Sequence, residues 1–283
     1  MFILLLIFLF FAFALGSVIG SFLNVVIMRG AKDESLQGRS HCDHCDKMLG
    51  ARELIPLVSF VYQKGRCRNC GIVLSVQYPL IELATGIVFA GVIYYTLLHA
   101  IILWDMALVM TLIILLASAS AMIVIVAADL KYHIIPNGAT LLLFLLGIAA
   151  ALGRSGLICF SAETICTAVS FNGIALDITA SIAFILFFFA IWFLSRGRAM
   201  GFGDVKLIGA TSLLLGFPLS LVAFLFSFWL GGLWGIFLLL TRMRGMKSQI
   251  AFGPFIIAGA VLAYFFGAQF LAVSGFSYVG YLF

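Results

Sequence analysis

The sequence predicts an all-α polytopic membrane protein of about eight transmembrane helices, interrupted near its N-terminus by one small polar insert. Of the 283 residues, 64% are hydrophobic and 10% are charged, and the mean hydropathy is +1.24. Soluble domains do not have that composition. The apolar runs are long and do not alternate, which excludes an outer-membrane barrel. The net charge of +5 is attributed to membrane topology, and we expect lipid but no nucleic acid as a partner.

A transmembrane helix needs about 20 apolar residues. The first apolar segment carries Gly16 and Gly20 at the spacing typical of close helix packing. Two later segments, 138–152 and 205–215, are short for a span. The predicted spans are 1–28, 78–98, 106–128, 138–152, 174–195, 205–215, 219–240 and 255–282.

The basic residues predict the orientation of these spans. Eight of the sixteen lie in the polar segment 29–77, which the positive-inside rule places in the cytoplasm. The N-terminus is then outside, and alternation of the spans leaves Arg154 as the one basic residue on the outer side. Asp129 and Asp204 both fall at the cytoplasmic ends of apolar runs.

The polar segment holds two pairs of cysteines, each with two residues between the thiols, and 21 residues separate the pairs. Four thiolates in this pattern predict a tetrahedral structural zinc site. A redox pair and reversible disulfides are the alternatives, but the cytosol is reducing. We expect His41 and His44 to be solvated neighbours of this site. The predicted ligands are Cys42, Cys45, Cys67 and Cys70.

Asp129 and Asp204 are the candidate catalytic residues, because acidic side chains beside membrane spans are costly without a function. Two adjacent carboxylates share one proton, so one can activate a water while the other donates to a scissile carbonyl. The residues alone leave helix capping and ion or proton transport open. Lys206 is a candidate to steady the Asp204 carboxylate.

Several segments resemble one known family. Residues 201–204 (GFGD) are similar to the GxGD signature of prepilin peptidases, the membrane aspartic proteases of type IV pilus and type II secretion systems. Residues 129–137 (DLKYHIIPN) resemble the other aspartate motif of that family, although Lys131 and Asn137 stand where the family often has acids. Further similar segments are 20–29 (GSFLNVVIMR), 53–56 (ELIP), 77–82 (QYPLIE) and 252–255 (FGPF).

The resemblance implies an aspartic endopeptidase that cleaves the basic leader of prepilins or pseudopilins after a glycine. Larger members that carry the cysteine insert also N-methylate the new terminal residue with S-adenosylmethionine. The implied location is the bacterial inner membrane, with the active site at the cytoplasmic face. The implied parts are a first transmembrane helix (1–28), a cytoplasmic four-cysteine zinc insert (29–77) and a transmembrane aspartic protease core (78–283).

The methyl-donor site cannot be read directly from the sequence. Polar or flexible positions in or beside the insert are its candidates: Glu53, Gly65, Arg66 and Glu82. The alternatives to a bifunctional enzyme are a dedicated GxGD membrane protease without methyl transfer and a proton-coupled transporter. Cys159 and Cys166 are expected either to form a disulfide on the outer side or to be two buried free thiols.

Overall fold

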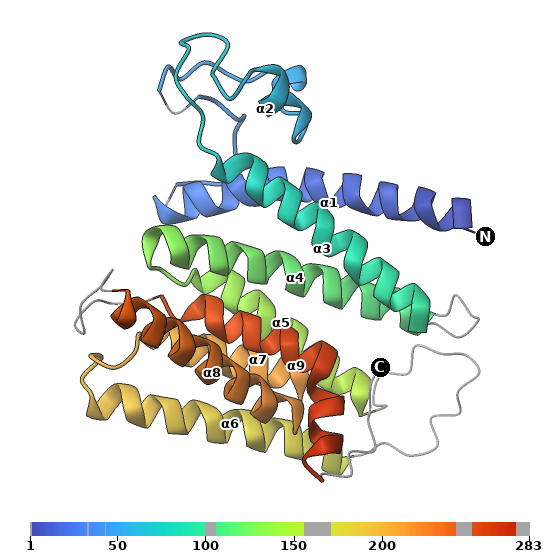
Figure 1. Cartoon of the computed structure of the whole chain (residues 1–283), viewed down its shortest axis with the longest axis vertical. Coiled ribbons are helices and arrows are strands. Elements are labelled where there is room, and N and C mark those ends of the chain that lie inside the picture. Colours follow the sequence, from blue (N-terminus) through green and yellow to red (C-terminus); the bar gives the residue numbers. More distant parts are fainter. Residues whose placement is uncertain are drawn as a thin grey trace. The chain divides into compact units, whose positions relative to one another are not determined.

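The computed structural model describes residues 2–32, 34–42, 44–99, 106–155, 171–241 and 251–275 (Figure 1). Within these ranges every regular element is a helix, and the only β-pairing is two isolated bridges in the insert. The long helices are α1 (Phe2–Ala31), α3 (Gln77–His99), α4 (Met106–Tyr132), α5 (Asn137–Arg154), α6 (Phe171–Leu194), α7 (Phe202–Leu215), α8 (Leu219–Leu240) and α9 (Gly253–Val273).

Seven of these helices are long and apolar enough to cross a membrane, which confirms the predicted fold class. The shorter predicted segment 138–152 is an 18-residue helix, α5, and qualifies. The segment 205–215 does not qualify, because α7 has only 14 residues and spans about 21 Å at 1.5 Å per residue. The last predicted span is described as α9, and residues 276–283 lie outside the described part.

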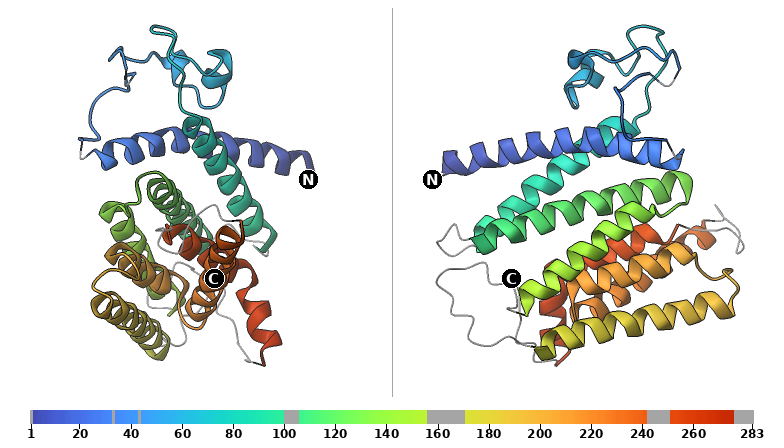
Figure 2. Two further views of the ribbon diagram at one scale, coloured as in Figure 1. Left: turned by 60° about the vertical axis from the view of Figure 1, so that its left-hand side comes forward. Right: turned by 180° about the vertical axis from the view of Figure 1, so that it is seen from behind.

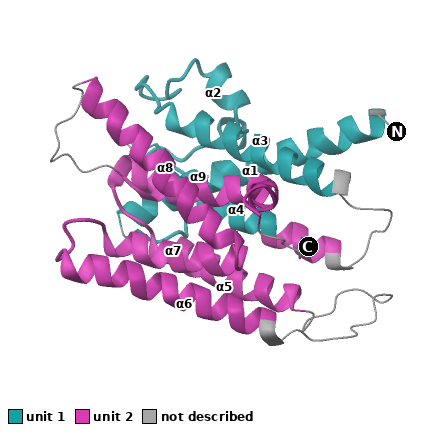
Figure 3. Cartoon of the chain, turned by 60° about the horizontal axis from the view of Figure 1, so that its bottom comes forward, with its two compact units in different colours: residues 1–104, 115–127 teal, residues 105–114, 128–283 magenta. Residues whose placement is uncertain are grey.

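The chain divides into two compact units, shown in Figure 3. Residues 1–104 and 115–127 form the first unit, and residues 105–114 and 128–283 form the second. The first unit therefore contains the polar insert with α1 and α3, and the second contains both aspartate motifs.

Glycines bring α1 and α3 into close contact in the first unit. A Cβ atom on Gly16 would lie 2.7 Å from the Thr85 carbonyl oxygen, and one on Gly20 would lie 2.8 Å from the Glu82 Cα. Only a residue without a side chain permits the two backbones to approach this closely. The packing role predicted for these two glycines is confirmed.

The insert is built from two turns of the same design, one for each cysteine pair. In the first turn the Cys42 N–H donates to the Lys47 carbonyl, and the Asp46 N–H donates to the Cys42 carbonyl. The second turn repeats this pattern, with Cys67 bonded to Ile72 and Gly71 bonded to Cys67. Two short segments, η1 (Ala51–Glu53) and α2 (Val58–Tyr62), connect the turns.

Helix α7 is the centre of the second unit. It contacts α5, α6, α8 and α9, and Figures 1 and 2 show these helices running alongside it. Every α7 residue from Asp204 to Leu215 is buried except Lys206. The core continues between α8 and α9, where Val222 and Ala223 pack against Ala260 and Ala263. A helix too short to cross a membrane is thus enclosed by helices that are long enough.

Large apolar side chains are exposed along the outer helices. On α6, for example, Leu186, Phe187 and Phe193 are all exposed. A soluble protein does not present apolar surface on this scale, whereas lipid chains cover it in a membrane. The exposed surface supports the same conclusion as the seven long helices: this is a membrane protein.

The close contact of α1 and α3 makes a testable prediction. Gly20→Ala should lower the melting temperature of the purified protein, because the new methyl group overpacks the contact at a cost of about 1–3 kcal/mol. Gly91→Ala on α3 is the matched control, since a Cβ there meets nothing within 4 Å. It should leave the melting temperature unchanged or raise it, because alanine favours helix over glycine by roughly 0.5–1 kcal/mol. Equal effects of the two substitutions would contradict this packing.

Candidate active site

Asp204 lies in the first turn of α7, at the third helical position after the N-cap residue Gly201. The Gly201 N–H donates to Asp204 Oδ2 at 3.1 Å, and the residue is only 8% exposed. A carboxylate in the first turn of a helix is also stabilised by the unpaired N–H groups and by the helix dipole. The local sequence therefore fixes the Asp204 carboxylate at the start of the central helix.

Asp129 lies near the end of α4 and is 6% exposed. Its Oδ2 accepts a hydrogen bond of 3.0 Å from the N–H of Gly253, the first residue of α9. A Cβ on Gly253 would lie 2.6 Å from that oxygen, so a side chain at this position would push the carboxylate away. Asp129 thus interacts with the N-terminus of α9 and not with that of α5, whose N-cap is Pro136.

Ile135 connects the two aspartate motifs. Its Cβ lies 3.0 Å from the position of a Cβ on Gly203, and its Cδ1 lies 3.6 Å from that of a Cβ on Gly253. The structure therefore brings the two predicted catalytic residues into one site, with the side chain of Ile135 packed against the glycine beside each.

Lys206 does not pair with Asp204 in the described part of the chain. Its Nζ donates to Asn137 Oδ1 at 2.7 Å and lies 5.1 Å from the centre of the Phe202 ring. The structure does not bear out the expected pairing of Lys206 with the Asp204 carboxylate. Lys206 instead links α7 to the N-terminal end of α5. Asn137 stands where the family often has an acid, and it supplies the acceptor oxygen for that contact.

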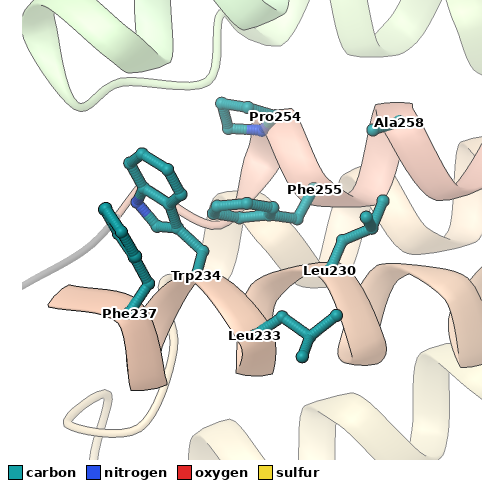
Figure 4. Close-up of a pocket in the computed structure, with 7 residues that line it drawn as sticks. All are labelled: Leu230, Leu233, Trp234, Phe237, Pro254, Phe255 and Ala258. Atoms are coloured by element: carbon teal, nitrogen blue, oxygen red, sulfur yellow. The ribbon is translucent and has the colours of Figure 1, made fainter. Parts of the chain in front are cut away.

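An apolar groove lies beside the Asp129 contact (Figure 4). Pro254 and Phe255, which directly follow Gly253, form one wall, and residues of α8 form the other. Every lining side chain is apolar, so the groove matches an apolar chain better than a polar ligand. The lining residues are Leu230, Leu233, Trp234, Phe237, Pro254, Phe255 and Ala258.

The four predicted cysteine ligands form one cluster in the insert. Their sulfur atoms all lie within 4.8 Å of one another, and Cys42 Sγ is 4.0 Å from Cys70 Sγ. With a Zn–S bond of about 2.3 Å, tetrahedral geometry separates the sulfurs by about 3.8 Å. Neither His41 nor His44 belongs to this group of potential ligands among the residues described.

Hydrogen bonds favour the thiolate form of two of these cysteines. Backbone N–H groups, first that of Cys70 and then that of Asn69, lower the pKa of the Cys67 thiol to about 7. The Asn69 side chain donates to Cys45 Sγ at 3.5 Å and lowers the pKa of that thiol, and Lys47 holds the Asn69 amide oxygen at 3.1 Å. Because metals bind the thiolate, the cluster has the chemistry of a metal site as well as its geometry.

The candidate methyl-donor residues have separate local roles. Glu53 accepts the Gly50 N–H within its own turn, and Gly65, with a φ of +67°, packs against the Phe60 ring. Arg66 is exposed in the second cysteine turn. Glu82 on α3 is buried, and its Oε2 accepts the Leu57 N–H at 2.8 Å. Cys159 and Cys166 lie outside the described residues, so their pairing stays a prediction.

Two family models match the chain. The bacterial peptidase A24 N-terminal domain matches residues 14–96, and the type IV leader peptidase family matches residues 114–236. A prepilin leader peptidase/N-methyltransferase of Bacillus subtilis is 32% identical over 90% of this chain and 93% of its own length. The chain belongs to this family. The predicted family is therefore confirmed.

Other members of the prepilin leader peptidase/N-methyltransferase family are similarly related to it. One from Pectobacterium carotovorum is 31% identical over 87% of this chain and 89% of its own. A type 4 prepilin-like proteins leader peptide-processing enzyme of Escherichia coli is 31% identical over 90% of this chain and 93% of its own. No solved structure matches the chain.

Sequence reasoning missed the part that Gly253 and Ile135 play in the site. Both lie in segments that resemble the family, but nothing local shows that Gly253 meets a carboxylate 124 residues away. The Gly-Pro step after the loop to α9 is the one available signal, because proline is favoured at the start of a helix and glycine permits close approach.

The contact with Gly253 predicts a sensitive position. Gly253→Ala should reduce leader cleavage by purified protein about 100-fold, because the displacement of a reacting group by 1 Å costs roughly that much. Gly232→Ala on α8 is the control, since a Cβ there meets nothing within 4 Å. Cleavage of a prepilin substrate, followed by gel mobility, measures the effect. Normal cleavage by the Gly253 variant would contradict a catalytic role for this contact.

Proposed function

We propose that this protein is a leader peptidase that cleaves the basic leader of type IV prepilins or pseudopilins and N-methylates the new terminal residue. The observation that carries the peptidase half is the pair of buried carboxylates, Asp129 and Asp204, at neighbouring helix ends. Membership of the leader peptidase family supports the same conclusion and favours it over proton transport.

We propose different tasks for the two oxygens of each carboxylate. In both residues Oδ2 is held by a backbone N–H, from Gly253 for Asp129 and from Gly201 for Asp204. The Oδ1 atoms accept no hydrogen bond from any described residue, which leaves them available to a water and to the scissile carbonyl. One proton shared by the pair lets one carboxylate act as base on the water while the other protonates the carbonyl oxygen.

The proposed location is the bacterial inner membrane, with the N-terminus outside and the active site at the cytoplasmic face. The positive charge around the insert supports it, as do Arg196 and Arg198 in the loop before Asp204. Arg154, the one basic residue on the proposed outer side, is buried against Asp177 and so is not an exposed loop charge. Its position therefore does not weaken the charge asymmetry.

Replacement of either carboxylate tests the peptidase. Asp129→Ala and Asp204→Ala should each abolish leader cleavage, and Asn at either position should fail as well, because an amide cannot exchange the shared proton. Glu34→Gln is the control, since Glu34 is an exposed acid that forms, among the residues described, one 4.0 Å surface ion pair with Lys32. The measurement is the conversion of prepilin to mature pilin on gels, at matched membrane expression. Near-normal processing by either alanine variant would rule out the assignment.

We further propose that the four-cysteine cluster holds structural zinc and that the methyl donor is S-adenosylmethionine. Bound zinc would cross-link the two cysteine turns, which have few apolar residues to form a core of their own. Glu82 is the candidate methyl-site residue with most support, because it is buried on α3 and bonded to the insert through Leu57. Glu53, Gly65 and Arg66 remain candidates on position alone. A dedicated peptidase without methyl transfer is the alternative.

Loss of the metal should separate the two activities. Cys67→Ser should release zinc and reduce methylation more than cleavage, because both aspartates belong to the other compact unit. His44→Ala is the control and should retain full metal content, since His44 lies outside the sulfur cluster. The measurements are zinc content by mass spectrometry and the mass of the processed pilin terminus.

A second assay isolates methyl transfer. The Asp204→Ala protein, given pre-cleaved pilin and S-adenosylmethionine, should still add the methyl group, because the carboxylate is needed only for cleavage. If the wild type adds no methyl group, the dedicated peptidase is correct. If Cys67→Ser abolishes both activities equally, the insert also serves cleavage.

A further inference from the structure

A buried ion pair lies away from both sites, at the other end of α7. Arg154, the last residue of α5, donates to Asp177 Oδ2 on α6 through Nη2 at 2.9 Å and through Nε at 3.2 Å. The two side chains are about one-tenth exposed. Within the described residues the other ion pair, between Lys32 and Glu34, is on the surface and 4.0 Å long.

Both partners also hold the C-terminal end of α7. Arg154 donates to the carbonyl oxygens of Leu214 and Leu213, at 2.8 and 2.9 Å. Asp177 Oδ1 accepts the N–H of Phe217 at 2.8 Å, just beyond the helix. Gly216, with a φ of +72°, makes room for the pair, since its Cβ would lie 2.8 Å from Asp177 Oδ1.

The length of α7 explains why its end needs these donors. A Cβ on Gly147 of α5 would lie 2.9 Å from the backbone nitrogen of Leu214, so Gly147 is beside the last turn of α7. From Gly147, α5 continues for seven residues to Arg154, about 10 Å at 1.5 Å per residue, whereas α7 ends at Leu215. The last residues of α7, Leu213 to Leu215, are buried, and their carbonyl groups have no partner within the helix, so they need donors from elsewhere in the protein. The Arg154 side chain reaches back along α5 to supply the missing donors.

We propose that the Arg154–Asp177 pair is a positioning pair that fixes α7 along its axis and so holds Asp204 in place against Asp129. The proposal rests on the catalytic role proposed for these two carboxylates. A packed helix moves as one piece, so a shift at its C-terminal end carries Asp204 with it. Substrate-contacting residues stay where they are, and we therefore expect kcat to fall about 100-fold with KM within about twofold of its normal value.

A disulfide between the two motifs reports the position of α7 without any activity. Ile135→Cys with Gly203→Cys places two Cβ atoms about 3.0 Å apart, so they must separate by about 0.5 Å to reach the 3.5–4.5 Å of a disulfide. Cys159 and Cys166 are changed to serine in this background. Mild oxidation and mass spectrometry of the linked peptides give the rate of cross-linking.

Three variants are compared in that background and in kinetic assays of otherwise unaltered protein. Arg154→Met removes the donors, Asp177→Asn keeps an acceptor for Phe217 but removes the charge, and Arg154→Lys keeps the charge with fewer donors. Lys32→Met with Glu34→Gln removes the surface ion pair as a control. We expect cross-linking to slow at least tenfold in the first two variants, to be intermediate in Arg154→Lys and to be unchanged in the control.

The outcomes separate this proposal from the proposed function. Unchanged cross-linking in Arg154→Met and Asp177→Asn would overturn the positioning role, whatever the enzyme does. So would a loss of yield and melting temperature with normal kcat per folded molecule, because that would show a purely structural pair. Slower cross-linking in a protein whose wild type cleaves no prepilin would uphold the positioning of Asp204 and overturn the peptidase. If Arg154→Met does not accumulate, Arg154→Lys tests the positioning role instead, by its cross-linking rate and its kcat.

Discussion

The second unit depends on one constraint: inside a membrane every backbone polar group needs a partner within the protein. Helix α7 is about 21 Å long and is buried from Asp204 to Leu215 except at Lys206, so the polar backbone groups at its ends need partners from the protein. At its start the Asp204 carboxylate accepts a hydrogen bond from the Gly201 N–H. At its end Arg154 donates hydrogen bonds to two backbone carbonyl groups. A helix shorter than the membrane can in this way present a carboxylate at a fixed depth, which a freely sliding span could not do.

Much of this was predictable from the sequence, because the informative patterns were local. Long apolar runs predict spans, and the spacing of the cysteines predicts that their sulfurs converge. The length of α7 was also visible, but a short apolar run does not reveal whether it crosses the membrane or is enclosed. Whether α7 is enclosed depends on its contacts with α5, α6, α8 and α9, and no single segment of the sequence predicts those contacts.

The contacts that sequence reasoning missed join residues far apart in the chain. Gly253 meets Asp129 across 124 residues, and Arg154 reaches Leu214 across 60. Lys206 shows the opposite error. It is close to Asp204 in the sequence, which suggested an interaction between the two side chains, but the helix directs them apart. At two positions apart on a helix the side chains point to different faces, so Lys206 turns instead to Asn137 on α5.

The aspartate and cysteine sites share one interaction: a backbone N–H that donates a hydrogen bond to an acidic side chain. Gly253 and Gly201 donate to carboxylates, and the N–H groups of Cys70 and Asn69 act on the Cys67 sulfur. Such donors are fixed by the fold and need no side-chain ordering, so they hold a charge in one orientation at little entropic cost. The interaction also explains where glycine is required. At Gly253 the donor must approach so closely that a Cβ would occupy the position of the carboxylate it orients.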